Sequence, residues 1–286
     1  ALLAMPDLYT QVPIAEEYFE VLERAAVEAD LLHDRQVLID VPWCGATGKA
    51  RDANGAVDWS RALRDRVADV ARTLTVYHPG VSVEDPEGGL MTPLRRIPPS
   101  GPVAGLISRL DRERTPYYTP ANASLYEVID VARGFSEDEE DALHVEGVNP
   151  LRCFPGKGIM VWGGRTLAGN GANPFLAHRR LIHRLVRAIR RVAEPLVFDV
   201  NGPVLWQTFQ RTVTGVLLRA YRAGALKGDR PEQAFRVKCD GETNPPESID
   251  SGRVVCEIEV APAAPMEFIQ LRVALSAEGA LEVFED

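Results

Sequence analysis

The chain has 286 residues, of which 45% are hydrophobic and 26% are charged, an ordinary composition for a globular protein and a length that suits two domains. Its formal net charge of −9 argues against a general nucleic-acid-binding protein, because such proteins carry a basic surface. No apolar run approaches the roughly 18 residues of a membrane span, so membrane insertion is not expected. The 4 cysteines form no CxxC pair, which favours synthesis in a reducing cytoplasm and predicts neither a metal site nor a cofactor.

Helices and strands are expected to alternate in the first part of the chain, which predicts an α/β domain with a parallel or mixed sheet. Asp58 or Ser60 is the expected cap of the second helix. Residues 79–102 are rich in Pro and Gly, which predicts a loop with a surface hairpin. The expected elements, in chain order, are helix 14–32, strand 36–41, a helix ending at Thr73, strand 73–77 and an element from Val103 to Leu110.

The most constrained stretch is the signature segment, residues 147–167. Ser136 followed by Glu139 is a capping-box pattern, which predicts a short acidic helix leading into this segment. Because proline fixes φ and glycine permits positive φ, we expect a loop with a closely specified backbone, followed by strand 159–162. The residues expected to form this structural loop are Asn149, Pro150, Arg152, Pro155, Gly156, Lys157, Gly158 and Trp162.

A small polar linker, residues 168–174, predicts a boundary between domains 1–168 and 169–286. The helix expected after it, residues 175–192, places aliphatic side chains on one arc and arginines on the other. Strand 268–275 alternates Ile, Leu, Val and Leu with other residues, as a half-buried strand does. The remaining expected elements are strand 196–200, helix 204–223 closed by Gly224, strands 234–239 and 253–260, and a last short segment, 281–284.

Charge is unevenly distributed along the chain. The arginine-bearing arc contains Arg179, Arg180, Arg184, Arg187 and Arg191, and the acidic residues that could meet it are Glu137, Asp138, Glu139, Glu282 and Asp286. Opposite patches of this kind suit head-to-tail contact between copies of one chain. The alternative is that each patch is simply the solvated face of a helix.

Enzymatic signatures are weak throughout. Residues 45–50 (GATGKA) lack the first glycine and the final hydroxyl of a phosphate-binding P-loop. No serine occupies a GxSxG elbow, and nothing in the sequence connects a histidine to a serine and an aspartate. The groups considered for such a triad are Asp40, His33, His78, His144, Ser60, Ser100 and Ser108. We therefore do not expect an enzyme.

The signature segment closely resembles the signature of contractile tail sheath proteins, in the run NPLRCFPGKGIMVWGGRTL. Gly164 and Pro102 stand where alanine is common in that family, and the family's amino-terminal arm is missing, so the chain is expected to begin inside a longer gene product. Further blocks that resemble the family are PPSGPVAG (98–105), PAN (120–122), GALKGDRPEQAF (224–235), VKCDGETN (237–244) and APAAPMEF (261–268).

The resemblance implies a subtilisin-like α/β core over 1–168 and a C-terminal α+β sheath domain over 169–286, ending in an extended inter-subunit strand at about 266–286. It implies stacked homo-oligomeric rings around an inner tube, with baseplate and cap proteins as further partners, in a phage tail or tail-like particle. The strand to be lent to a neighbour comprises Phe268, Ile269, Gln270, Leu271, Arg272, Val273, Ala274 and Leu275. The alternatives are a hydrolase on the same core, a small-ligand-binding domain, and a strand that merely completes its own sheet.

Overall fold

The computed structural model describes residues 1–6, 8, 15–43, 49–88, 93–114, 118–169, 174–263, 269–275 and 281–285. The chain forms two compact units, Ala1–Arg180 and Leu181–Asp286. This division falls inside a helix, whereas the sequence placed the boundary in the linker at 168–174, most of which lies outside the described residues. The linker boundary stays a prediction.

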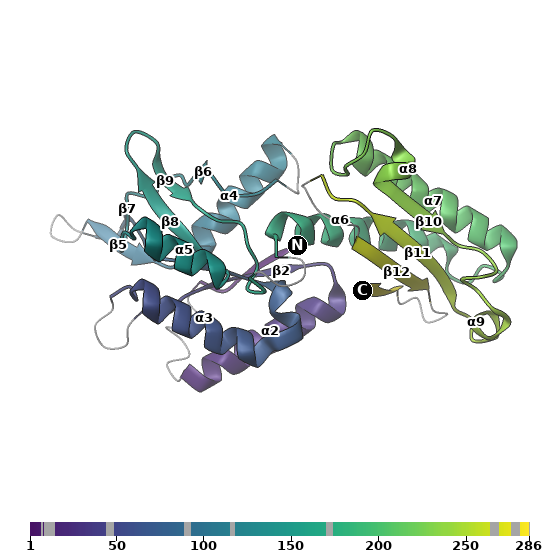
Figure 1. Ribbon diagram of the computed structural model, residues 1–286, viewed down its shortest axis with the longest axis horizontal. Helices are drawn as coiled ribbons and strands as arrows, with labels where there is room; N and C mark the ends of the chain where they lie inside the picture. The colour runs from purple at the N-terminus through teal and green to yellow at the C-terminus, as the bar shows by residue number, and fades with distance from the viewer. Residues whose placement is uncertain are drawn as a thin grey trace. The chain divides into compact units, whose positions relative to one another are not determined.

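The first unit is built on a six-stranded mixed sheet (Figure 1). Its first four strands run parallel, and β9 and β6 are added antiparallel. The strand order is β1 (Leu2–Ala4), β2 (Gln36–Asp40), β3 (Leu74–His78), β8 (Val148–Phe154), β9 (Gly158–Val161) and β6 (Ala123–Ser124). The expected α/β class is therefore confirmed.

Helices cover both faces of this sheet, because alternate side chains of a strand point to opposite sides. In β2, Val37 and Ile39 pack in one core with α2 (Ala15–Leu32), α3 (Ala53–Val67) and α5 (Glu137–Val145). Leu38, between them, packs in a second core with α4 (Ser100–Glu113). A turn of 3₁₀ helix, η2 (Ala68–Thr73), joins α3 to β3.

The expected surface hairpin within residues 79–102 is confirmed. It is formed by β4 (Val81–Glu84) and β5 (Leu94–Ile97), and β7 (Asp130–Val131) joins β4 on its other edge. Residues 123–131 supply β6 and β7 to two different sheets.

The second unit packs helices against a four-stranded antiparallel sheet (Figure 1). Helix α6 (Leu176–Ala193) is followed by η3 (Glu194–Leu196) and α7 (Pro203–Arg222). The sheet order is β10 (Phe235–Lys238), β11 (Val254–Val260), β12 (Ile269–Leu275) and β13 (Leu281–Glu285), with short helices α8 (Pro231–Ala234) and α9 (Pro246–Asp250) beside it. The face of β11 that carries Val254, Cys256, Ile258 and Val260 is buried.

Two local predictions are wrong. Asp52, not Asp58 or Ser60, caps α3, because its side chain accepts a hydrogen bond from the Gly55 N–H at 2.8 Å. Residues 196–200 do not form a strand: the chain turns after η3, and the Phe198 and Val200 side chains are 92% and 90% exposed. An isolated apolar run cannot distinguish a buried strand from an exposed connection, because the sequence does not say whether a sheet edge is available.

Candidate functional site

The signature segment is organised by one buried side-chain amide, that of Asn149. Its Nδ2 donates to the backbone oxygens of Val76 at 2.9 Å and Arg165 at 2.8 Å, and its Oδ1 accepts from the Arg165 N–H at 2.7 Å. Asn149 is 1% exposed, so these bonds form away from bulk water. A buried amide with all of these bonds made specifies one arrangement of β3, β8 and the segment that follows β9.

Two glycines of the segment are required by this close packing. A Cβ at Gly163 would lie 2.6 Å from Asn149 Oδ1. Gly147 has a φ of +77°, and a Cβ there would lie 2.6 Å from the Thr166 backbone oxygen. A side chain at either position would push into a fixed neighbour, so the glycines serve the architecture of the segment.

The expectation of a loop from Asn149 to Gly158 is partly wrong, because Val148–Phe154 is strand β8. Pro150 is tolerated since the parallel ladder with β3 ends at the pair His78–Pro150, and the antiparallel ladder with β9 begins at Leu151. Proline has no N–H to offer a ladder, so it suits the position where pairing changes partner. Only the tip, Pro155–Lys157, is a turn.

The hairpin tip of the signature segment is its exposed part. Gly156 and Gly158 adopt φ values of +76° and +80°, as expected for glycines in this turn. Arg152 is engaged within the chain: its Nη1 lies 3.0 Å from Glu140 Oε2, and its guanidinium lies 5.0 Å from the Phe154 ring centroid. The Phe154 and Trp162 ring centroids are also 5.0 Å apart. Asn149, Arg152 and Trp162 are therefore structural, and the exposed tip at 155–158 is what the segment presents to solvent.

The acidic helix α5 begins with the predicted capping box. The Ser136 N–H donates to Glu139 Oε2 at 2.9 Å, and the Glu139 N–H donates to Ser136 Oγ at 3.4 Å. Glu139 is therefore engaged in helix capping, while Glu137 and Asp138 are exposed. Of the acidic residues on this helix that the sequence assigned to a charged interface, those two are the exposed ones.

The arginine-rich helix α6 does not expose all of the arginines assigned to a charged interface. Arg179 is fully buried and Arg180 is 7% exposed. Arg180 forms an ion pair with Asp111 and donates to the Tyr118 backbone oxygen at 3.3 Å. The prediction that Arg179 and Arg180 belong to a charged interface is therefore wrong. Every residue from His178 to His183 is buried, so this part of the helix has no solvated face. The arginines that remain exposed are Arg184, Arg187 and Arg191.

The predicted C-terminal strand is present as β12. Its residues pair antiparallel with β11, from Val260–Ile269 to Val254–Leu275, and β13 pairs with its other edge. In this single chain β12 therefore belongs to the chain's own sheet, and lending it to a neighbour stays a prediction. Phe268 and Asp286 lie outside the described residues, and Glu282 lies in β13.

A serine and an aspartate of the considered triad do meet, but in a structural arrangement. Asp40 Oδ1 accepts from the Ser100 N–H at 2.7 Å, and Oδ2 accepts from the Ser100 hydroxyl at 2.5 Å. Ser100 is the first residue of α4, where a carboxylate is stabilised by free N–H groups and the helix dipole. Ser100 is fully buried and Asp40 is 2% exposed, so this pair positions a helix and offers nothing to a substrate.

The other two serines bond backbone oxygens. Ser60 Oγ donates to the Glu146 backbone oxygen and Ser108 Oγ to that of Ala104. His78 is buried against the Phe135 ring, with its Nε2 3.0 Å from the Arg51 backbone oxygen. Burial lowers the pKa of His78 to about 4, so this histidine is neutral near neutral pH. This arrangement of His78 suits packing.

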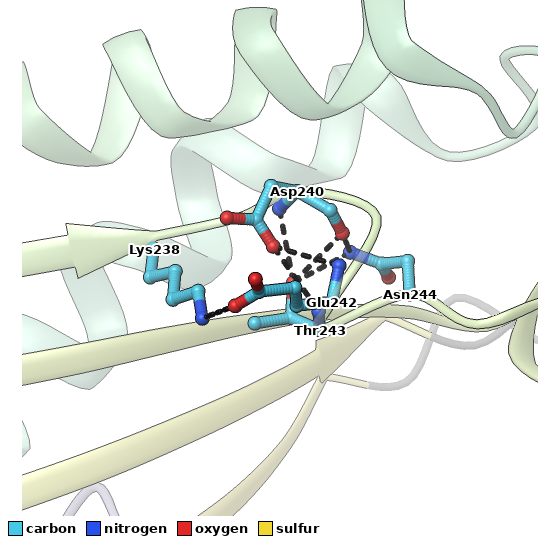
Figure 2. Close-up of polar contacts among 5 residues, drawn as sticks. All are labelled: Lys238, Asp240, Glu242, Thr243 and Asn244. Carbon is cyan, nitrogen blue, oxygen red and sulfur yellow. Dashed lines mark hydrogen bonds and ion pairs between the residues drawn. The ribbon is translucent and has the colours of Figure 1, made fainter.

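A polar turn follows β10 in the second unit (Figure 2). Asp240 Oδ1 accepts from the N–H groups of Glu242 at 2.9 Å and Thr243 at 3.2 Å, and Lys238 forms an ion pair with Glu242. The buried Asn244 closes the turn: its Nδ2 donates to the Asp240 backbone oxygen at 3.0 Å. Asn244 also bonds both polar groups of Val255 in β11. The turn thereby connects the end of β10 to the neighbouring strand.

Two of these arrangements were not identified from the sequence as interacting sites. The Asp40–Ser100 pair joins residues sixty positions apart, and Asn244 reaches Val255 across a turn and a short helix. The sequence shows an aspartate at the end of an apolar strand and an asparagine before Pro245. Neither pattern indicates which residue the side chain will contact. Within the described ranges, no three His, Cys, Asp or Glu side chains lie where they could share a metal ion. No helix described there combines the length and apolar character that crossing a bilayer requires.

Comparison with known proteins gives consistent matches along the chain. The family model of the phage tail sheath protein central domain matches residues 33–167, and that of the phage tail sheath C-terminal domain matches residues 175–276. The tail sheath protein of Vibrio phage KVP40 is 30% identical over 190 residues, which cover 64% of this chain and 27% of that protein. The chain thus spans about a quarter of the length of this curated relative.

Solved structures from the anti-feeding prophage are similar over 94% of the chain. The helical sheath of the anti-feeding prophage in its contracted state is similar with a TM-score of 0.72 and 28% identity, covering 94% of this chain and 68% of that one. A chain of the 6-fold symmetrised baseplate of the same prophage is similar with a TM-score of 0.73 and 26% identity, covering 94% and 66%.

Proposed function

Because the chain belongs to the phage tail sheath family, we propose that it is a structural subunit of a contractile sheath, which polymerises as stacked rings around an inner tube and contracts to drive that tube through a target envelope. The observation that carries the proposal is the succession of both sheath domains over residues 33–167 and 175–276. The similarity to a contracted sheath over 94% of the chain supports it. The chain acts as a building element and not as an enzyme.

The partners of such a subunit are other copies of itself, the inner tube protein, and the baseplate and cap proteins of the same particle. The particle is a phage tail or a tail-like particle assembled in the bacterial cytoplasm. Exposed apolar side chains on the second unit fit a surface that assembly would cover: Phe198, Val200 and Val204 are 92%, 90% and 81% exposed. Clustered apolar exposure of this kind is typical of protein interaction surfaces.

The link between copies is the exchange of strand β12, which would pair with β11 of a neighbour in the register that it adopts within the single chain. Backbone pairing supplies the affinity in such strand addition, and alternate side chains supply the register. Each backbone hydrogen bond contributes about 0.5–1.5 kcal/mol net, so a seven-residue strand contributes several kcal/mol per link. A link of that strength tethers neighbours while other contacts between them change.

Mixed disulfide trapping tests this exchange. The register places Arg272 opposite Glu257, and Glu257 lies on the partly exposed face of β11. In a Cys153→Ser background, chains carrying Glu257→Cys are mixed with chains carrying Arg272→Cys before assembly, and the mixture is oxidised gently. Strand exchange predicts covalent dimers in assembled material, because each chain then supplies only one of two facing thiols.

The matched control carries the cysteine at Leu275 and keeps Arg272. Leu275 pairs with Val254, three positions along β11 from Glu257, so chains with Leu275→Cys should link far less. If tubes form, seen by negative-stain microscopy, but the in-register mixture yields no more dimer than the control, strand exchange is wrong. Absence of rings or tubes when the full particle components are coexpressed would refute the sheath function itself.

A charged contact between copies is a second element of the proposal. Arg184, Arg187 and Arg191 would face acidic surface of a neighbour, either Glu137 and Asp138 or the C-terminal tail. Replacing Arg184 and Arg191 by glutamate should make assembly weaker and less sensitive to salt, because interactions between exposed charges are screened by salt. The same replacement at the exposed Arg222, at the end of α7, is the control. Unchanged assembly, salt dependence and contraction in the double variant would exclude this contact.

A further inference from the structure

Two buried cysteines face each other across neighbouring strands of the second unit. The β10–β11 register pairs Phe235 with Val260 and Lys238 with Glu257. Cys239 follows the last residue of β10, and continuing the register by one pair sets it opposite Cys256. Cys239 is 3% exposed and Cys256 is fully buried, and both are free thiols.

The hydrogen bonds of the adjoining residues define which kind of cross-strand pair this is. The Val255 N–H donates to Asn244 Oδ1 at 2.6 Å, and the Val255 oxygen accepts from Asn244 Nδ2 at 3.0 Å. Both polar groups of Val255 thus point to the β10 side, where Asn244 takes the place of a further strand residue. Cys256, the next residue, points its polar groups to β12 instead, because antiparallel strands alternate in this way.

The hydrogen bonds of β10 indicate the same class of cross-strand pair. The Val237 backbone oxygen accepts from Gln210 Nε2 at 3.0 Å, so it points away from β11. Cys239 is two positions further and has the same orientation. Cys239 and Cys256 therefore form a non-hydrogen-bonded pair, in which Cα atoms lie about 4.5 Å apart and side chains are closest. Disulfides span Cα separations of roughly 4.4–6.8 Å, so the pair falls within the permitted range.

From this juxtaposition we infer that Cys239 and Cys256 form a redox-sensitive site, a dithiol that closes to an intrachain disulfide between β10 and β11 when the protein meets a hydroperoxide. The facing position of the two thiols carries the inference. The exposed Cys153 has no such partner within the described part of the chain, and it serves as an internal reference for oxidation.

The surroundings assign different roles to the two sulfur atoms. Asn244 Nδ2 lies 3.9 Å from Cys239 Sγ and can donate to it (Asn244 is shown in Figure 2). A hydrogen bond from the Cys256 thiol lowers the pKa of Cys239 against the opposing effect of burial, and the Asn244 amide lowers it further. The same thiol pair and burial raise the pKa of Cys256. Because the Asn244 amide lies beside Cys239 and stabilises negative charge there, Cys239 is assigned the first attack.

The chemistry balances with a hydroperoxide as the two-electron oxidant. The Cys239 thiolate attacks the terminal peroxide oxygen, the O–O bond breaks, and a sulfenic acid forms with release of water (or an alcohol) after proton uptake. The Cys256 sulfur then attacks Cys239 Sγ, the S–O bond breaks, and the second water leaves with the Cys256 proton. Two thiols and one hydroperoxide yield one disulfide and two hydroxyl-bearing molecules.

This disulfide would join β10, which precedes the polar turn, to β11, which pairs with β12. Cys256 pairs with Val273 on the β12 side, so the link would stiffen the strand on which β12 is seated. The dithiol form belongs to a reducing cytoplasm, and the disulfide form to a particle exposed to oxidants outside it.

The test uses the full-length wild-type chain, treated with hydrogen peroxide, unfolded, alkylated with N-ethylmaleimide and analysed by peptide mass spectrometry. The expected result is the loss of two alkylatable thiols as one Cys239–Cys256 cross-link, reversed by dithiothreitol, together with a higher urea midpoint of the second unit. Recovery of both cysteines as separate thiols or as sulfinic acids, in samples where Cys153 is oxidised, would overturn the inference.

A variant gives a second readout of the order of attack. In Cys256→Ser the hydroxyl keeps a donor beside Cys239 but cannot resolve its sulfenic acid, so labelling of Cys239 by dimedone should rise several-fold over wild type. The Cys153→Ser variant should behave like wild type at the buried pair. Equal dimedone labelling of Cys239 in wild type and Cys256→Ser would show that Cys256 does not resolve the sulfenic acid, and would refute the site.

Discussion

Replacing Asn149 by alanine removes the amide that holds the signature segment together, and its cost can be worked from the three bonds lost. The Arg165 N–H loses its 2.7 Å acceptor, and the backbone oxygens of Val76 and Arg165 each lose a donor. An orphaned buried donor costs about 1–3 kcal/mol, and each carbonyl bond contributes roughly 1 kcal/mol net. The variant should therefore destabilise the first unit by about 3–5 kcal/mol, a large part of the stability of a typical domain.

Hydrogen exchange read by mass spectrometry measures this change locally. Since each 1.4 kcal/mol is a factor of about ten in an equilibrium, a loss of 3 kcal/mol should lower the protection of slowly exchanging amides in β3 and β8 by roughly a hundredfold. Peptides from α7, in the second unit, give the internal reference. The exposed Asn54 on α3 is the matched control, and Asn54→Ala should change protection little. If Asn149→Ala were as mild as Asn54→Ala, the amide would not be the organising group argued above.

Three further outcomes can be checked by urea unfolding. Gly147→Ala should cost at least about 2 kcal/mol, because Gly147 has a positive φ and the new Cβ would lie 2.6 Å from a backbone oxygen. Gly105→Ala lies in open space within α4 and should stabilise the protein by about 0.5–1 kcal/mol. Equal effects of the two substitutions would contradict the packing argument. Burial lowers the pKa of His78 to about 4, below the roughly 6.5 of an unfolded chain, so the free energy of unfolding falls as pH drops from 6.5 toward 4. His78→Gln should remove about 2 kcal/mol of that loss at pH 5. Parallel curves of stability against pH for the two proteins would refute this role of His78. Asp52→Ala should cost about 1 kcal/mol through loss of the α3 cap, and no change in the urea midpoint would argue against the cap.

Several local elements could be predicted from the sequence because their signals are local. The capping box of Ser136 and Glu139 involves groups three residues apart, and it is present as expected. Gly224 closes α7 with a φ of +73°, a conformation that glycine adopts at little cost. The helices over residues 15–32 and 203–222 follow from apolar spacing.

Other features depend on partners that are distant in the sequence. The charged wheel of α6 suggested a solvated arc, yet Arg179 is fully buried, because the pattern alone does not reveal how many sides of a helix are covered. Pro150 suggested a loop, yet it lies within β8, because the sequence does not show that two ladders change over at that residue.

Taken by itself, the sequence determined the α/β character of the chain, its family resemblance and the residue types at tight turns, since these depend on neighbours within a few positions and on motifs readable in order. Tertiary structure alone decided that Asn149 and Asn244 are structural centres, that Asp40 meets Ser100, and that Cys239 faces Cys256. A buried polar group or thiol acquires its role from the atoms that surround it, and those atoms are brought together only when strands and helices far apart in the chain pack into one core.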